Sequence, residues 1–330
     1  MVVVKANAYG HGLTHIAKAL FVEGCRLFAV TDANEGLSLR KHLPQNADII
    51  LLSGIFDALD AQCCVTHRLT PVVTSTSHVK HLQQAGFQGS VWLKVDTGMH
   101  RLGAINAFGL HQHIQDANIH LAGVMSHLAC ADTPKHPLNQ QQIHRFQAIC
   151  KQIPAPAYSL FNSAGLIAFS ASHHFNVARP GIALYGIEPI PSQPLELKPV
   201  AELSSQVIHI HKVKQGESVS YGASWVAPQD MRIAVVAMGY ADGLPRLLSN
   251  QGKAWVHGCL LPIVGRVCMD YCMLAVGSSK VQEGDKVVFF GGKENQPLAN
   301  HIATQCQTIA YEIFTHLDKR LLRTYVGEST

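Results

Sequence analysis

The 330-residue sequence has few charged residues and no long apolar run, and each shortage excludes a class of protein. Asp, Glu, Lys and Arg make up only 15% of the chain, which excludes a disordered tail protein and a charge-rich coiled coil. The apolar run at residues 49–52 soon meets Asp57 and Asp60, so no stretch predicts a membrane span. The first residues lack the regions of a signal peptide, and the nine cysteines form no disulfide framework. These absences predict a soluble cytoplasmic protein with reduced thiols.

The basic residues and the histidines point to no special partner either. The net charge of +4 comes from 26 Lys and Arg against 22 Asp and Glu, too mild a surplus to predict a nucleic-acid partner. His209 and His211 would share one strand face, but no carboxylate or cysteine at ligand spacing completes a metal site. The same holds for His111 and His113 in a helical stretch. We therefore predict no metal.

Short apolar runs alternate with helically spaced segments in the first part of the chain, which is typical of a parallel βα architecture. The eight candidate strands lie at residues 2–5, 27–30, 48–52, 70–74, 90–95, 119–125, 157–161 and 175–178. Eight such units favour a closed (β/α)8 barrel of the TIM type. An open doubly wound sheet is the alternative, but no G-x-G-x-x-G follows the first strand.

The sequence changes character near residues 189–199, where prolines crowd in a way that suits a linker. Beyond them, β-like alternation separated by turn signals recurs at residues 206–210, 232–237, 254–256 and 286–290. One late helix is expected over residues 299–317. We predict an α/β protein with a barrel domain at residues 1–198 and a mostly antiparallel β domain at residues 199–330.

Polar residues recur at the carboxyl ends of the predicted strands, where barrels gather functional groups. They are Lys5, Ser53, Lys94, Asp96, Thr97, Arg101, His127, Asn162, Ser163 and Arg179, with Gly98, Gly181 and Ile182 beside them. Each has a simpler interpretation, since a basic residue at a strand end is usually solvated and Asn-Ser usually caps a helix. Their convergence on one rim predicts a ligand pocket. Glu35, after the second strand, is interpreted as a helix N-terminal charge rather than an acid catalyst.

Lys5 is the most informative single residue. A lysine at the mouth of an apolar barrel is partly desolvated, which lowers its pKa and frees the amine for Schiff-base chemistry. Gly10 and Gly12 follow it and let the backbone approach a ligand closely. The alternative is a lysine that extends to solvent, and the spacing alone leaves both possibilities open.

Longer motifs resemble those of one enzyme family. The segment VVKANAYGHG at residues 3–12 resembles the cofactor-lysine signature of alanine racemases, which depend on pyridoxal phosphate. Six further segments resemble motifs of the same family: LKVDTGMHRLG (93–103), NSA (162–164), RPGIALYG (179–186), VSYGA (219–223), GYADG (239–243) and GRVCMD (265–270). They span nearly the whole chain in order, so chance matching is implausible.

The resemblance implies a barrel and a β domain that work as a head-to-tail homodimer with shared active sites. The implied reaction interconverts L- and D-alanine and supplies D-alanine for peptidoglycan. Lys5 is implied to carry pyridoxal phosphate and to act as the base on the D-enantiomer, and Tyr221 of the partner subunit as the base on the L-enantiomer. Arg101 is implied to contact the cofactor's phenolic oxygen and the substrate. Met269 of the partner subunit is implied to bind the substrate carboxylate through its backbone amide.

The resemblance also implies how the rest of the site is built. Tyr9, Ser163, Gly181 and Ile182 are implied to hold the phosphate, Arg179 to face the pyridine nitrogen, and His127 to sit near the ring, while Lys94, Asn162, Arg266 and Asp270 are implied as supporting residues. Lys94 matches a position that is carbamylated in some relatives. Two bases suit the chemistry, because racemisation removes a proton from one face of a carbon and returns it to the other.

The chain departs from the family's pattern at both ends. It starts almost at Lys5, and we expect it to lack the strand and helix that lead the barrel in relatives. Near the other end, Lys319 stands where relatives have a tyrosine near the substrate entrance. The remaining functional alternatives are a broad-specificity or serine racemase and a non-catalytic remnant that binds pyridoxal phosphate.

Overall fold

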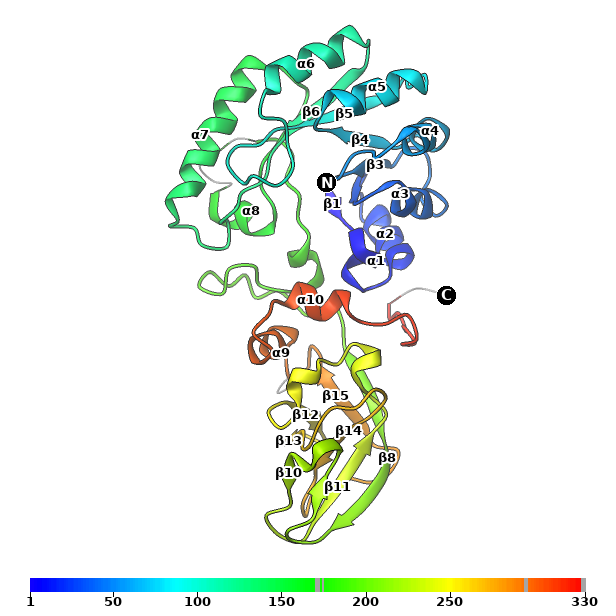
Figure 1. Ribbon diagram of the computed structural model, residues 1–330, viewed down its shortest axis with the longest axis vertical. Coiled ribbons are helices and arrows are strands. Elements are labelled where there is room, and N and C mark those ends of the chain that lie inside the picture. Colours follow the sequence, from blue (N-terminus) through cyan, green and yellow to red (C-terminus); the bar gives the residue numbers. More distant parts are fainter. Residues whose placement is uncertain (170–172, 174, 294–295, 328–330) are drawn as a thin grey trace. The chain divides into compact units, whose positions relative to one another are not determined.

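The computed structural model describes residues 1–169, 173, 175–293 and 296–327, which fall into two compact units (Figure 1). The first unit comprises residues 1–8, 12–184 and 188–195. The second comprises residues 9–11 and 185–187 and the chain from residue 196 onward. The predicted domain spans include residues 170–172, 174, 294–295 and 328–330, which lie outside the described residues. Within the described ranges, no helix is both long and apolar enough to cross a bilayer.

The first unit contains seven parallel strands that pair in sequence order. They are β1 (Val2–Val3), β2 (Leu27–Val30), β3 (Asp48–Leu51), β4 (Thr70–Val73), β5 (Ser90–Lys94), β6 (His120–Met125) and β7 (Tyr158–Ser159). Each lies within or on a predicted run. The strands are buried on both faces, since Ile49, Ile50 and Leu51 of β3 are all fully buried. Such burial is typical of a parallel sheet covered by helices, and each large aliphatic side chain contributes roughly 1.5–3 kcal/mol.

The eighth predicted strand, residues 175–178, has no regular strand, but its backbone closes the ring. On one side, Val177 and Arg179 donate backbone hydrogen bonds to β7 and to Phe161. On the other side, the terminal amino group of Met1 donates to the carbonyl of Ala178, and the backbone N–H of Val3 donates to the carbonyl of Pro180. The predicted barrel architecture is therefore confirmed, with an irregular eighth segment.

Helices follow the barrel strands and cover their outer face (Figure 1). They are α2 (Leu13–Val22), α3 (Ala33–Arg40), α4 (Ala58–His67), α5 (Thr76–Gln84), α6 (Ala107–Asp116), α7 (Pro137–Gln152) and α8 (Ser163–Phe169). Several begin where an Asp or Asn side chain accepts a hydrogen bond from the first turn, as Asp32, Asp57 and Asn106 do. These caps satisfy backbone donors that a helix start leaves free, and so they set where each βα loop ends.

The second unit contains a six-stranded antiparallel sheet in the order β13-β12-β15-β8-β11-β14. The strands are β8 (Leu203–Val213), β11 (Met231–Val236), β12 (Lys253–Val256), β13 (Cys259–Pro262), β14 (Cys272–Ala275) and β15 (Lys286–Phe290), and β9 (Ser218–Val219) pairs with β10 (Trp225–Val226) outside this sheet. The four runs predicted from alternation coincide with β8, β11, β12 and β15. Short 3-10 turns occur at η1 (Ile182–Tyr185), η2 (Tyr221–Ala223), η3 (Tyr240–Asp242) and η4 (Arg246–Leu248).

The prediction of one late helix over residues 299–317 is wrong. The segment forms two helices, α9 (Ala299–Gln305) and α10 (Ala310–Thr315). The break falls where Gln307 adopts a left-handed backbone with φ 53° and Ile309 is extended. Neither conformation continues a right-handed helix, so the hydrogen-bond ladder ends and restarts.

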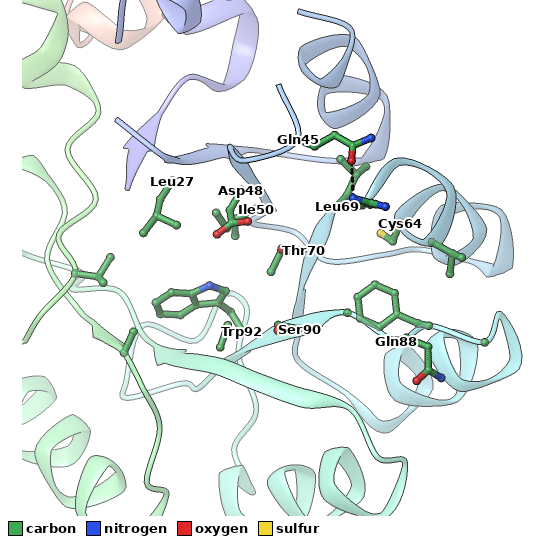
Figure 2. A pocket seen from close by; sticks show the side chains of 18 residues that line it. Leu27, Gln45, Asp48, Ile50, Cys64, Leu69, Thr70, Gln88, Ser90 and Trp92 are labelled. Atoms are coloured by element: carbon green, nitrogen blue, oxygen red, sulfur yellow. Dashed lines mark hydrogen bonds between the residues drawn. The ribbon is translucent and has the colours of Figure 1, made fainter. Parts of the chain in front are cut away.

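A cavity of about 630 Å³ opens at the amino-terminal ends of the barrel strands (Figure 2). Leu27, Asp48, Thr70 and Ser90, the first residues of β2 to β5, line it, and the Trp92 ring lies beside them. The polar residues predicted to be functional follow the opposite, carboxyl ends of the strands. This cavity is therefore not the candidate active site.

Candidate active site

Basic side chains from several barrel strands gather at the carboxyl ends, as the sequence predicts. Lys5, Lys94, Arg101 and Arg179 all act electrostatically on His127, which follows β6. Lys94 and Arg179 are buried, with 8% and 5% of their surface exposed. Several positive charges gathered where burial excludes water favour an anionic ligand.

Lys5 is half-buried at the start of this cluster. Desolvation lowers the pKa of its ammonium group, and the nearby Arg101 charge lowers the pKa further. The Glu35 carboxylate opposes both effects. The net direction agrees with the expectation for a lysine at a barrel mouth, and it makes the neutral, nucleophilic amine more available.

The backbone after Lys5 differs from the prediction. The expected strand at residues 2–5 ends at Val3, and α1 (Lys5–Tyr9) is a left-handed turn. Its residues Ala6, Asn7 and Ala8 have φ of 51°, 55° and 52°. A left-handed helical conformation costs roughly 1–2 kcal/mol for each residue with a Cβ atom, so other contacts must hold this turn in place.

Several hydrogen bonds stabilise the left-handed turn. Ala8 donates from its backbone to the Val4 carbonyl at 2.8 Å, and Gly12 to the Asn7 carbonyl at 2.9 Å. The Asn7 side chain accepts from the backbone of Leu13 at 2.8 Å, which caps the start of α2. These bonds connect the lysine-bearing turn to the first barrel helix.

Arg179 is the buried centre of a second network. Its guanidinium donates to Ser159 Oγ at 2.5 Å, to the Ser126 carbonyl at 2.5 Å and to the Leu160 carbonyl at 3.3 Å. It also lies 3.1 Å from His127 Nδ1. Burial lowers the pKa of Arg179 to about 10, so the group stays charged at neutral pH.

His127 is held in one protonation state by this neighbour. Arginine can only donate, so His127 Nδ1 accepts and the neutral ring carries its proton on Nε2. Burial places the pKa of His127 well below its usual value, and the charges of Arg179, Arg101, Lys94 and Lys5 lower it further. His127 is therefore a neutral donor through Nε2.

Removing the buried guanidinium should destabilise the barrel. Arg179→Met leaves buried oxygen acceptors without a donor, and we expect it to cost about 3 kcal/mol of unfolding free energy. Urea unfolding of the cofactor-free protein measures the loss. The control is Arg145→Met, because Arg145 also donates to a backbone carbonyl of the same unit but is exposed. Equal losses in the two variants would contradict the network's role.

The Ser163 hydroxyl links the start of its own helix to the segment that begins at Gly181. Its Oγ accepts from the backbone of Gly181 at 2.9 Å and of Ala183 at 3.3 Å. Asn162 Oδ1 accepts from Gly165 at 2.9 Å, so the simpler interpretation of Asn-Ser as a helix cap also holds. The start of α8 and the start of η1, at Ile182, thus meet at one hydroxyl. Hydroxyl and backbone N–H donors at helix starts suit a phosphate group.

Tyr9, the other predicted phosphate residue, belongs to the second unit. Its buried ring lies 4.9 Å from the Tyr185 ring and 5.7 Å from the Tyr311 ring, measured between centroids. Burial raises the pKa of the Tyr9 hydroxyl, so it stays protonated and can donate. Its role toward a phosphate remains a prediction.

The predicted second base also lies in the second unit. Tyr221 is 70% exposed and Met269 is 54% exposed. Arg266 packs under the Tyr221 turn, because a Cβ atom built on Gly222 would lie 2.7 Å from the Arg266 guanidinium. The exposure of both side chains leaves them free to meet another surface.

Two residues that the sequence analysis did not select as functional support these groups. Arg320 donates to Asp270 at 3.0 Å and to Asp242 at 2.7 Å, which ties the chain beside Met269 to its unit. Glu35 accepts from the backbone of Ala6. No sequence spacing signals either contact, because each joins residues 29 or more positions apart.

The chain matches known proteins over nearly its whole length. Residues 1–189 match the family described as alanine racemase, N-terminal domain, and residues 200–325 match the alanine racemase C-terminal domain. An alanine racemase of Shewanella denitrificans is 39% identical, over 97% of this chain and 90% of its own. A catabolic alanine racemase of Agrobacterium fabrum is 38% identical, over 98% of this chain and 85% of its own.

Solved structures of such enzymes have the same fold. The biosynthetic alanine racemase from Pseudomonas aeruginosa has a TM-score of 0.90 and 34% identity, with 98% of this chain and 91% of that chain covered. The alanine racemase from Bartonella henselae, solved with covalently bound pyridoxal phosphate, has a TM-score of 0.91 and 34% identity, with coverages of 98% and 92%. With both of its halves matched and these relatives so similar, this chain belongs to the alanine racemase family.

Proposed function

We propose that this chain interconverts L- and D-alanine with pyridoxal phosphate attached to Lys5. The observation that carries the proposal is the desolvated Lys5 amine, which lies among basic groups at the carboxyl rim of a barrel whose relatives are alanine racemases. The covalently bound cofactor of the Bartonella henselae enzyme supports the same assignment.

The residues present fit the cofactor. Ser163 offers its hydroxyl hydrogen and Ile182 a backbone N–H for its phosphate, and the N–H of Gly181 orients the Ser163 oxygen. Arg101 offers a cation for its phenolic oxygen, and Arg179 would face its ring nitrogen. When bound, pyridoxal phosphate supplies an electron sink that makes the Cα–H of the amino acid acidic. A guanidinium does not give up its proton at neutral pH, so Arg179 would leave the ring nitrogen unprotonated.

Two side chains would move the proton. The Lys5 amine accepts it on the face from which D-alanine is deprotonated, and the phenol of Tyr221 of the partner subunit serves the opposite face. A base on each face is needed because a single group can return the proton only to the side it took it from. His127, neutral and protonated on Nε2, can donate a hydrogen bond toward this region.

A homodimer would bring the two bases together, and exposed apolar side chains support it. In the first unit, Phe56, Leu59 and Ile105 are 70%, 80% and 91% exposed near the starts of α4 and α6. In the second unit, Tyr221 and Met269 are exposed. A dimer that covers these exposed large side chains would remove their apolar surface from water.

We also propose the domain division at residues 198 and 199, a cytoplasmic location and a supply of D-alanine to peptidoglycan. The division is supported by the family matches, which end at residue 189 and resume at residue 200. The location is supported by the nine cysteines, all of which are free thiols in the described chain.

A racemisation assay tests the proposed activity. Purified protein with added pyridoxal phosphate should convert L-alanine to D-alanine, measured with a D-amino-acid-specific oxidase. L-Serine is assayed in parallel, because Lys319 replaces the tyrosine expected near the substrate entrance. Conversion of serine at an equal or higher kcat/KM would replace the alanine assignment with a broader one, and no conversion of either would refute the racemase proposal.

Lys94 should carry carbon dioxide as a carbamate. Burial and the charges of Arg179, Arg101 and Lys5 lower the pKa of Lys94 to about 8. Roughly a tenth of the amine is then neutral at pH 7 and able to react. The product carries a negative charge, which removes repulsion from the neighbouring cations. We expect a carbamate signal in ¹³C NMR with labelled bicarbonate that Lys94→Met abolishes and Lys253→Met, at an exposed lysine, retains. A signal that persists in Lys94→Met would place the carbamate elsewhere.

A further inference from the structure

Both carboxylate oxygens of Glu35 bind backbone N–H groups at the carboxyl ends of the first two barrel strands. Oε1 accepts from Ala6 at 2.6 Å, directly after Lys5, and Oε2 accepts from Thr31 at 2.7 Å, directly after β2. The bond to Thr31 is local and resembles those of a helix N-terminal charge, whereas the bond to Ala6 spans 29 positions and is not part of that role. The carboxylate thereby bridges the lysine-bearing turn and the end of the neighbouring strand.

The backbone at the start of α3, which carries Glu35, is itself held in place. Asp32 Oδ1 accepts from the Glu35 backbone at 3.0 Å and caps the helix. Gly36 packs so closely on the barrel that a Cβ atom there would lie 2.8 Å from Leu51 Cδ2 and 3.0 Å from Leu69 Cδ1. The side chain therefore extends from a rigid element to a strained one.

The bond to Ala6 falls where the strain begins. Ala6 is the first of four consecutive non-glycine residues with φ between 51° and 55°. This conformation directs the chain away from β1 immediately after Lys5, and a change at Ala6 would move the lysine. A strained backbone segment persists only where surrounding contacts hold it in that conformation.

We propose that Glu35 is a positioning residue for Lys5, whose carboxylate fixes the left-handed turn that presents the lysine at the barrel rim. The inference rests on the proposed role of Lys5 in racemisation. Glu35 also supplies negative charge to a basic site. The Arg101 charge lowers the pKa of Lys5, and the Glu35 carboxylate raises it. Lys5 in turn lowers the pKa of Lys94 and of His127. Glu35 therefore favours the ammonium form of Lys5 in a basic site.

Glu35→Gln separates positioning from simple folding. The amide has one acceptor oxygen and no charge, so it loses one of the two bonds and the attraction to Lys5. The matched control is Asp32→Asn, which removes a carboxylate from the same helix start while asparagine keeps the cap. Both variants are compared by circular dichroism and thermal unfolding. Glu35→Ala removes both hydrogen bonds and the charge.

The first readout is the reactivity of Lys5 in the cofactor-free full chain. Trace acetylation across pH, followed by peptide mass spectrometry with exposed Lys18 as internal reference, gives the titration midpoint. We expect Glu35→Gln to lower the midpoint by about half a unit, which raises the modification rate below the midpoint about threefold. Asp32→Asn should leave it unchanged.

The second readout is racemisation by the loaded enzyme. We expect kcat to fall about tenfold in Glu35→Gln and further in Glu35→Ala, because a small displacement of a reacting group is costly. Asp32→Asn should stay within about twofold of the original chain. A midpoint and kcat in Glu35→Gln that match Asp32→Asn would overturn the inference. A lower kcat with an unchanged midpoint and a matching loss of thermal stability would also overturn it, because Glu35 would then only support folding. An active Lys5→Ala variant would instead refute the proposed function.

Discussion

Lys5→Ala is expected to abolish racemisation, with a loss of at least about 10⁴-fold in kcat, because it removes both the cofactor attachment and one of the two bases. The change deletes the amine whose pKa is lowered by desolvation at the barrel rim. Borohydride reduction followed by mass spectrometry should label Lys5 in the original chain and leave no label at that position in the variant.

The control for this loss is Lys18→Ala, because Lys18 is an exposed lysine on neighbouring α2. It should keep full activity and the label at Lys5. A Lys5→Ala variant that still racemises alanine, or a reduced cofactor found on another lysine, would contradict the assignment of the catalytic amine.

Tyr221→Phe is expected to slow proton removal from L-alanine by about 10²–10⁴-fold, and removal from D-alanine far less, because only one face loses its base. The asymmetry follows from the two-base arrangement and not from a general loss of structure. Exchange of the Cα proton with deuterated solvent, followed by NMR for each enantiomer separately, measures both rates.

Tyr271→Phe is the matched control, since Tyr271 is another exposed tyrosine of the same unit. It should leave both exchange rates near those of the original chain. Equal slowing for L- and D-alanine in Tyr221→Phe would remove Tyr221 as the base for one face.

Most of the barrel could be predicted from the sequence because its strands are short, apolar and buried on both faces. The predicted runs at 27–30 and 48–52 differ from β2 and β3 by at most one residue. The rim residues Lys94, His127 and Arg179 follow from the same logic, since parallel strands end on one side.

Other features depend on contacts or backbone conformations that no local sequence pattern indicates. The left-handed turn at Ala6–Tyr9 contains no glycine, so the sequence suggests a continued strand or an ordinary loop. Glu35 stands in the first turn of a helix, where a charge is common for unrelated reasons. Its bond to Ala6, 29 positions away, becomes visible only when β1 and β2 lie side by side. The break between α9 and α10 likewise comes from the left-handed Gln307, which composition does not reveal.

The central claim is that the Lys5 amine of one subunit works with the Tyr221 phenol of the other. Mixing Lys5→Ala and Tyr221→Phe proteins, with unfolding and refolding to exchange subunits, tests it directly. Each mixed dimer would contain one intact site and one doubly altered site, so we predict recovery of about a quarter of the original activity from two weakly active or inactive parents. If both bases belong to the same subunit, no mixed dimer has an intact site, and activity no higher than the average of the two parents would contradict the account.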